Sequence, residues 1–375
     1  MKTRIALLRE MGLPRPYTES RPLEIVEATL EAPEPGEMRV KLAAAGLCHS
    51  DLSTINADRP RVMPMAIGHE AAGIVEEVGP GASRFAPGDH VVMVFVPSCG
   101  HCVPCAEGRP ALCEPGAAAN GAGTLISGEK RLSAEGETIN HHLGVSAFSD
   151  RVIVSENSCV KIDDDIPLDR AALLGCAVLT GVGAVLNSGA LRPGQDVAVI
   201  GLGGVGLAGL LGAIAGGARR VIAVDLAKDK RDFALELGAT HAIDPTEEGA
   251  VETVKGWTSG GVDLAVELAG AVPALKYAYA ITRRGGTTVT AGLPHPEAEL
   301  SFPPVSLTAE ERVLKGSYVG SCVPVRDIPR YAAMMMKGQL PIEKLMTHTI
   351  KLEDINEGFE RLAAGKAIRQ VIVFD

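Results

Sequence analysis

The strongest constraint on the fold of this chain is the segment of residues 196–218, which reads DVAVIGLGGVGLAGLLGAIAGGA. An apolar run of strand length leads into Gly201, Gly203 and Gly206, and an apolar helical stretch follows. Between a strand and a helix, this G-x-G-x-x-G pattern is typical of a dinucleotide site, because the glycines let the backbone approach a pyrophosphate at the helix N-terminus. The segment therefore predicts a parallel α/β sheet that binds a dinucleotide at its edge.

The next apolar run, RRVIAVDLAKDK at 219–230, ends in Asp225. Its distance from Gly201 is close to the spacing of about 20 residues expected for an acid that hydrogen-bonds both ribose hydroxyls. A carboxylate there also repels a 2′-phosphate, so the sequence predicts NAD rather than NADP. Further short apolar runs at 241–245, 262–270 and 286–294 alternate with helical stretches, as expected for βαβ units.

A second feature is the segment CGHCVPCAEGRPALC, which places four cysteines at separations of three, three and eight: Cys99, Cys102, Cys105 and Cys113. Two-residue spacers let thiolates surround one tetrahedral zinc ion, and glycine and proline favour the tight loop that this needs. An iron–sulfur cluster also takes four thiolates, and redox use or coincidence remains a further alternative. Four protein ligands leave no open position, so we expect a structural zinc lobe at 95–115 in which His101 is a bystander.

A third group of residues is scattered along the chain. Cys48 lies in GLCHSDL, His69 and Glu70 lie in AIGHEAAG, and Cys176 lies in LLGCAVLTG. Two thiolates and one imidazole are typical of a catalytic zinc, which keeps its fourth position for water or substrate. Each residue alone also fits an ordinary core position, and Cys48 alone fits a nucleophile or half of a disulfide.

Composition narrows the class of protein. The 375 residues suggest two domains, and 46% hydrophobic with 22% charged residues is an ordinary globular balance. No apolar run is long enough to span a bilayer, and the N-terminus does not resemble a secretory signal. The net charge of −10 argues against nucleic-acid binding. We therefore expect a soluble cytoplasmic protein without a membrane or nucleic-acid partner.

Taken together, GLCHSDL, GHEAAGIVEEVG, the four-cysteine lobe, GCAVLTG and GLGGVG resemble the zinc-dependent medium-chain alcohol dehydrogenases, in their dimeric two-zinc branch. The resemblance covers essentially the whole chain. It implies a GroES-like, mostly-β catalytic domain and a Rossmann doubly wound parallel-sheet cofactor domain. It also implies NAD and two zinc ions per subunit.

The resemblance assigns roles to individual residues of the catalytic centre. Cys48, His69 and Cys176 would be the catalytic zinc ligands, and Glu70 would be a carboxylate that can approach the metal. Asp51 would hydrogen-bond His69 and fix its tautomer. Ser50 would accept the proton of the alcohol.

The resemblance also implies the contacts to the cofactor. His49 and Arg369 would meet the pyrophosphate, and Lys230 would lie over the adenosine ribose. The nicotinamide would contact Thr180, Val205, Gly292 and Leu293.

The expected domain organisation is discontinuous. Residues 1–177 begin the catalytic domain, 178–320 form the cofactor domain, and 321–375 complete the catalytic domain. The segment 114–147 is rich in glycine and polar residues, which predicts a long loop with a hairpin, and its length resembles the dimeric branch. We expect a homodimer joined near 301–320, with a tetramer as the alternative.

The resemblance places six residues in the wall of the substrate pocket: Phe95, Ala118, His142, Leu143, Leu293 and Tyr318. Their size favours primary alcohols of medium chain length or with an aromatic ring, oxidised to aldehydes. Two departures from the family pattern matter. Ser53 stands where many relatives end a proton relay with histidine, and residues 117–119 are alanines where glutathione-linked enzymes carry an arginine.

Other functions stay open at this point. One alternative is a formaldehyde dehydrogenase acting on a glutathione adduct, and others are a polyol dehydrogenase or a non-catalytic cofactor-binding relative. An inert relative would have no chemical need to keep Cys48, Ser50, His69, Glu70 and Cys176 together, so the sequence favours the enzyme.

Overall fold

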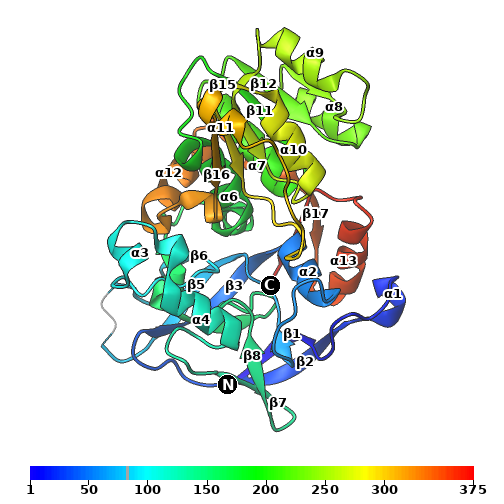
Figure 1. The fold of residues 1–375 in the computed structure, drawn as a ribbon. Coiled ribbons are helices and arrows are strands. Elements are labelled where there is room, and N and C mark those ends of the chain that lie inside the picture. Colours follow the sequence, from blue (N-terminus) through cyan, green and yellow to red (C-terminus); the bar gives the residue numbers. More distant parts are fainter. Residues whose placement is uncertain (82–83) are drawn as a thin grey trace. The chain divides into compact units, whose positions relative to one another are not determined.

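The computed structural model describes residues 1–81 and 84–375. The chain forms two compact units. The first contains Met1–Cys176, Val323–Met336 and Glu343–Asp375, and the second contains Ala177–Cys322 with Lys337–Ile342. Figure 1 shows the chain course of both, coloured along the sequence.

The second unit is built on one parallel sheet of six strands in the order β13-β12-β11-β14-β15-β16. Their bounds are His241–Ile243, Arg220–Val224, Asp196–Ile200, Val262–Glu267, Thr282–Thr290 and Val313–Gly316. This is the doubly wound order of a dinucleotide-binding fold, in which ligands bind at the carboxyl ends of the strands. The parallel α/β sheet predicted from the sequence is therefore confirmed.

Helices connect these strands and pack on the sheet (Figure 1). They are α6 (Ala177–Gly183), α7 (Gly204–Ala215), α8 (Lys228–Glu236), α9 (Ala250–Trp257), α10 (Val272–Ile281) and α11 (Val305–Ala309). A π-helical turn, Ala184–Ser188, extends α6, and a 3₁₀ turn covers Val319–Ser321. Strands β11, β12 and β14 are almost entirely buried, as expected for a parallel sheet covered on both faces.

The first unit contains a closed barrel of short strands, in the order β1-β2-β7-β8-β4. The bounds are Lys2–Leu8, Leu23–Leu30, Leu132–Ala134, Glu137–His141 and Met65–Ala66. Closure leaves no free edge, and the interior is filled by Ile5, Leu7, Leu30, Leu132 and Ile139.

A second sheet of the same unit runs β10-β6-β5-β3-β18-β17, with β9 also paired to β3. The bounds are Cys159–Lys161, His90–Met93, Ala71–Val78, Glu37–Leu47, Arg369–Val373, Met346–Ile350 and, for β9, Arg151–Ser155. Strand β3 pairs with both β5 and β18, so segments from three distant parts of the sequence meet along it. Its buried face joins the largest of the described cores, which includes Phe148 and Phe359.

The remaining helices of the first unit are short or peripheral. They are α1 (Tyr17–Ser20), α2 (His49–Ile55), α3 (Val103–Ala106), α4 (Glu114–Ala122), α5 (Leu168–Ala171), α12 (Pro324–Met336) and α13 (Ile355–Ala363). The 3₁₀ turns of this unit are Pro110–Leu112, Glu156–Ser158, Ala172–Gly175 and Leu352–Asp354, and a further turn, Ile342–Leu345, begins at the last residue of the second unit.

The segment 114–147 combines a correct prediction with an omission. The expected hairpin is present as β7 and β8, which pair antiparallel. Helix α4 was not expected, because glycine and polar residues indicated a loop there. It forms because Pro115 suits the first turn, Cys113 Sγ accepts the N–H of Gly116, and Gly123 ends the helix with φ 71°.

Within residues 1–81 and 84–375, no single helix is long and apolar enough to cross a membrane. One bent pair, Leu168–Gly175 followed by Ala177–Ser188, meets the requirement by length and composition alone.

Candidate metal centres and cofactor site

A buried cluster of metal-ligand side chains lies at one end of β3 in the first unit. The ligand atoms of Cys48, His69, Glu70 and Cys176 all lie within 4.8 Å of one another. Cys48 directly follows β3, and the antiparallel register of β3 with β5 brings His69 and Glu70 beside that strand end. Cys176 follows a 3₁₀ turn, and its Sγ lies 3.3 Å from His69 Nε2. The structure thus brings together residues that are far apart in the sequence.

This donor set fits a zinc ion. Two thiols and one imidazole are the ligands that zinc takes at sites with an open position, and all three side chains are buried. A buried oxygen, Glu70 Oε2, has no hydrogen-bond partner among the described residues. A cation in the cluster would offset the cost of burying it, because polar atoms removed from water need a partner.

Asp51 fixes the orientation of the His69 ring. The Asp51 Oδ1 atom lies 2.7 Å from His69 Nδ1, and Oδ2 accepts the backbone N–H of Cys48. Burial lowers the pKa of His69, but the Asp51 carboxylate outweighs it, so that the pKa lies well above the usual value. Because the Asp51 carboxylate can only accept, the hydrogen bond places a proton on Nδ1, and Nε2 is directed towards the thiols.

Glu70 and Arg369 form a buried ion pair beside the same cluster. Arg369 opens β18, which pairs with β3, so the strand order delivers the guanidinium to the cluster from the carboxyl-terminal part of the chain. Burial raises the pKa of Glu70 to about 7, and Arg369 opposes that rise. The contact of Arg369 with a pyrophosphate stays a prediction, and its Nε has no partner among the described residues.

Helix α2 carries the remaining residues predicted for this centre. His49 is exposed and Ser50 is half-buried in the first turn, directly after Cys48. Ser53 lies one turn further along, where many relatives carry histidine. The helix starts next to the thiol because Cys48 has extended backbone and caps it.

The four-cysteine segment forms a second cluster in the same unit. The sulfur atoms of Cys99, Cys102, Cys105 and Cys113 lie within 4.8 Å of one another. Backbone N–H groups point at sulfur, with Cys102 N 3.2 Å from Cys99 Sγ and Cys99 N 3.2 Å from Cys113 Sγ. No disulfide joins any of the eight cysteines, all of which lie in the described part of the chain. Four convergent sulfurs with N–H···S contacts fit a structural zinc, and the exposed His101 hydrogen-bonds the carbonyl of Cys99 instead.

The glycine-rich turn of the second unit has the geometry of a dinucleotide site. Gly201 has φ 90°, and a Cβ there would lie 2.6 Å from the backbone of Ala269. A side chain is also excluded at Gly206, because a Cβ added there would meet the carbonyl of Gly201. Gly203 caps α7, and a Cβ there would face open space. The backbone is therefore accessible at the helix N-terminus, where a phosphate would bind.

Asp225 directly follows β12, beside that turn. Its carboxylate accepts the backbone N–H of Leu202 at 2.7 Å and that of Ala227 at 2.9 Å. The acid is thus held next to the glycine-rich turn, as its spacing predicted. Lys230 lies half-buried in α8.

The predicted nicotinamide contacts all lie in the second unit. Thr180 in α6 and Val205 in α7 are half-buried on helices that pack closely, since a Cβ on Gly181 would lie 2.2 Å from the carbonyl of Val205. Gly292 and Leu293 follow β15, and the N–H of Gly292 donates to the carbonyl of Glu267. Their contacts with a cofactor stay a prediction.

The predicted pocket residues are divided between the units. In the first unit, the rings of Phe95 and His142 meet His69 edge-on, with centroids 5.2 and 5.9 Å away. Leu143 is buried and has φ 53°, while Ala118 is exposed on α4. Leu293 and Tyr318 belong to the second unit, and both are exposed.

His142 has a contact that the sequence did not indicate. Its Nδ1 accepts the N–H of Gly68 and lies 3.4 Å from Asp51 Oδ1. The spacing of residues 51, 69 and 142 carries no signal for this proximity, because they belong to separate segments that only the tertiary fold brings together.

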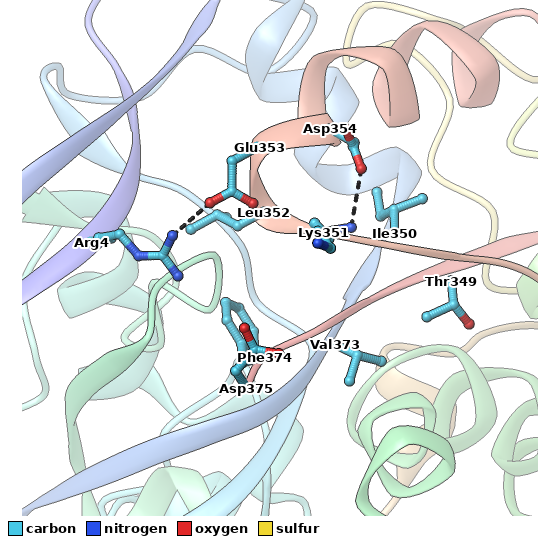
Figure 2. Close-up of a pocket in the computed structure, with 10 residues that line it drawn as sticks. All are labelled: Arg4, Thr349, Ile350, Lys351, Leu352, Glu353, Asp354, Val373, Phe374 and Asp375. Atoms are coloured by element: carbon cyan, nitrogen blue, oxygen red, sulfur yellow. Dashed lines mark hydrogen bonds and ion pairs between the residues drawn. The ribbon is translucent and has the colours of Figure 1, made fainter.

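A cavity of about 700 Å³ lies elsewhere in the first unit, around the ends of β17 and β18. Figure 2 shows its lining, which is formed by Arg4, residues 349–354 and residues 373–375. Arg4 is paired there with Glu353. None of the residues predicted for the metal or cofactor sites lines this cavity, so it is not the candidate site.

Each of the two units matches a known protein family. Residues 34–164 match the family model of the alcohol dehydrogenase GroES-like domain, and residues 204–337 match that of the zinc-binding dehydrogenases. An NDMA-dependent alcohol dehydrogenase of Amycolatopsis methanolica is 39% identical over the whole chain and 99% of its own length. The S-(hydroxymethyl)glutathione dehydrogenase of Paracoccus denitrificans is 37% identical over all of both chains. The crystal structure of benzyl alcohol dehydrogenase from Acinetobacter calcoaceticus has a TM-score of 0.93 at 29% identity, over all of both chains.

Proposed function

The chain belongs to the zinc-dependent medium-chain alcohol dehydrogenase family, and from this premise we propose that it oxidises primary alcohols to aldehydes with NAD, reversibly. The substrate class proposed is medium-chain or aromatic. The observation that carries the proposal is the convergence of Cys48, His69 and Cys176, with Glu70 beside them, in one buried cluster. A fold without catalysis would not need this costly set of buried polar groups.

Cys48, His69 and Cys176 would hold a catalytic zinc. When bound, zinc supplies a Lewis acid that lowers the pKa of a hydroxyl group and so prepares an alcohol for loss of hydride. Asp51 keeps the proton of His69 on Nδ1, which leaves Nε2 as a ligand atom. Arg369 neutralises Glu70 inside the buried cluster and holds that carboxylate in place.

Ser50 would take the proton of the substrate at its Oγ, because it follows Cys48 on the first turn of α2 and is partly accessible. Ser53 has no ring nitrogen with which to pass that proton on. The proton route would therefore continue through the cofactor ribose and water.

The glycine-rich turn and Asp225 would hold the cofactor. The N-terminus of α7 would receive the pyrophosphate, and His49 and Arg369 are the two further residues proposed to contact it. The carboxylate of Asp225 would bind the ribose hydroxyls and reject a 2′-phosphate, which supports NAD rather than NADP. The four-cysteine cluster would hold the second, structural zinc of each subunit.

The aromatic neighbours of His69 support the substrate class. The rings of Phe95 and His142 stand nearly perpendicular to the ring of His69, and such edge-to-face contacts are among those that aromatic groups prefer. Likeness to benzyl alcohol dehydrogenase agrees with this proposal. Likeness to S-(hydroxymethyl)glutathione dehydrogenase keeps the glutathione adduct as the second candidate, but Ala117, Ala118 and Ala119 offer no cation for its carboxylates.

We further propose a cytoplasmic homodimer joined through the edge strand β16. This strand pairs with β15, and no described strand pairs with its other edge. Val313 on β16 and Val305 on α11 are exposed apolar residues near that edge. Light scattering coupled to size-exclusion chromatography measures the oligomeric state, and a monomeric or tetrameric mass would contradict the homodimer.

The proposed function is tested by initial rates of NAD reduction with ethanol, hexanol, benzyl alcohol, a secondary alcohol and S-hydroxymethylglutathione. We expect the largest kcat/KM for hexanol or benzyl alcohol, and little reduction of NADP. NDMA serves as a second electron acceptor in parallel assays. A maximum at the glutathione adduct would replace the proposed substrate class, and inactivity of the fully metallated protein with every alcohol and both acceptors would refute the proposal.

A further inference from the structure

The loop after β12 carries the acid on which cofactor choice depends. In this loop, residues 225–227, the Asp225 carboxylate is oriented by two backbone N–H groups, those of Leu202 and Ala227. One of these donors lies within the loop itself. The direction of the carboxylate therefore depends on where the main chain of the loop is held.

Arg231 holds that main chain from the following helix. Its Nη1 atom donates to the carbonyl of Asp225 at 2.7 Å and to the carbonyl of Leu226 at 2.8 Å. The Arg231 side chain is only 16% exposed, whereas Leu226 is 66% exposed. The guanidinium is thus packed under the loop and ties two successive carbonyls to α8.

Asp244 holds Arg231 in turn. It follows β13, and the parallel register that places Val224 beside Ile243 brings Asp244 next to the loop. Its Oδ2 lies 3.1 Å from Arg231 Nη1, and its Oδ1 accepts from the hydroxyl and the N–H of Thr246. These hydrogen bonds from Thr246, together with Arg231, hold the pKa of Asp244 below its usual value. Asp244 is therefore ionised at neutral pH.

We propose that Arg231 and Asp244 are positioning residues that determine the affinity and specificity of this protein for the adenosine ribose of the cofactor. The inference rests on the proposed function, because it assumes that Asp225 binds a ribose. Arg231 would act by fixing the loop, and Asp244 would act by neutralising Arg231. While Arg231 and Asp244 are both present, their charges cancel, and the net charge beside the ribose is that of Asp225 alone.

The two residues therefore have opposite effects on charge. Loss of Arg231 leaves two carboxylates, Asp225 and Asp244, and frees the loop. Loss of the Asp244 charge leaves the Arg231 guanidinium, which contacts the main-chain carbonyl of Asp225, without its counter-charge and so weakens the repulsion of a 2′-phosphate. A pair that only stabilised the fold would change the binding of both cofactors by the same factor.

The test uses the full-length metallated protein and two ligands without nicotinamide, ADP-ribose and 2′-phospho-ADP-ribose. Their Kd values are measured calorimetrically for wild type, Arg231→Met, Asp244→Asn and Arg219→Met. The last is the matched control, because Arg219 forms an arginine–aspartate pair with Asp196 at the opposite end of β12. Circular dichroism and thermal melting show that each variant is folded.

For Arg231→Met we expect about tenfold weaker binding of ADP-ribose, because a carboxylate displaced by even about 1 Å loses its ribose hydrogen bonds. Its discrimination against the 2′-phosphate should increase, because the carboxylates of Asp225 and Asp244 would then both repel that group. For Asp244→Asn we expect discrimination to fall severalfold. Arg219→Met should leave both Kd values within twofold of wild type. If Arg231→Met does not fold, the inference is tested by the ratio of the two Kd values in Asp244→Asn.

Equal changes for both ligands, or no change in either variant, would overturn the inference. The enzyme assay separates this failure from failure of the proposed function. Suppose that the wild type oxidises alcohols with NAD and that both variants discriminate between the two ligands as the wild type does. This result would refute only the role of Arg231 and Asp244. Suppose instead that the wild type oxidises no alcohol, but that the two variants change the discrimination between the ligands in opposite directions. This result would refute only the proposed function.

Discussion

The carboxylate of Asp51 lies 2.7 Å from Nδ1 of His69, and neither side chain is accessible to solvent. The same carboxylate accepts the N–H of Cys48, so one acid orients two of the three proposed zinc ligands. Because Cys48 and Asp51 come directly after β3 and His69 lies just before β5, the geometry of the cluster depends on the register of β3 with β5.

Replacing Asp51 by Asn should weaken the catalytic metal site selectively. Partners of metal-bound histidines typically contribute about 10–100-fold to metal affinity or activity. We expect a loss of that size in kcat/KM, with faster release of one zinc to a chelator. Asp196→Asn is the control, because it also removes a buried carboxylate but lies in the other unit. Equal zinc release from both variants would show that the effect is general destabilisation.

Replacing Cys48 by Ala should abolish turnover and reduce the zinc content from two ions per chain to one. The four-cysteine cluster is separate from Cys48 and should keep its ion. Elemental analysis of the purified variant gives the metal content. Cys159→Ala is the matched control, since Cys159 is a buried thiol outside both clusters. Normal turnover in the Cys48 variant would contradict the assignment of the catalytic ligand.

Replacing Asp225 by Ser should shift cofactor preference towards NADP. The change removes the charge that would repel a 2′-phosphate, so the ratio of kcat/KM for NADP to that for NAD should rise at least tenfold. Binding of NAD itself should weaken, because the N–H groups of Leu202 and Ala227 lose their acceptor. Initial rates with both cofactors measure the ratio. An unchanged ratio would remove Asp225 from the cofactor site.

Stability should fall as the pH is lowered from about 6.5 to 4, partly because of His141. Burial lowers the pKa of His141 to about 4 in the folded protein. An unfolded histidine titrates near 6.5, so in this interval the unfolded state binds the extra proton and is favoured. The effect is at most about 1.4 kcal/mol for each unit of pKa difference. Above about pH 7 the contribution is constant.

Urea unfolding at a series of pH values measures this dependence. His141→Gln should reduce the loss of stability between pH 6.5 and 4, whereas His295→Gln, at an exposed histidine, should leave it unchanged. The prediction fails if the wild-type and His141→Gln curves run parallel across this interval.

Local sequence was sufficient for some parts of the structure. The segment from Asp196 to Ala215 predicted β11, the glycine turn and α7, because buried strand, sharp turn and apolar helix are each encoded by neighbouring residues. The four cysteines also converge locally, since their spacers are short. Helix α4 was missed because its glycines and polar residues indicated a loop and outweighed the helical propensity of its alanines. It depends instead on capping by Cys113 Sγ and on the close approach of Gly116 to the carbonyl of Pro97.

The sequence by itself therefore determined the class of sheet, the glycine-rich turn, the acid that follows β12 and the two sets of metal-binding residue types. Only the tertiary structure decided that Cys48, His69 and Cys176 meet, that Arg369 pairs with Glu70, and that Arg231 and Asp244 lie under the Asp225 loop. The physical reason is that residue types and short-range spacing are encoded along the chain. Proximity between distant segments arises from strand pairing, here of β3 with β5 and β18 and of β12 with β13, which buries the apolar faces of both sheets.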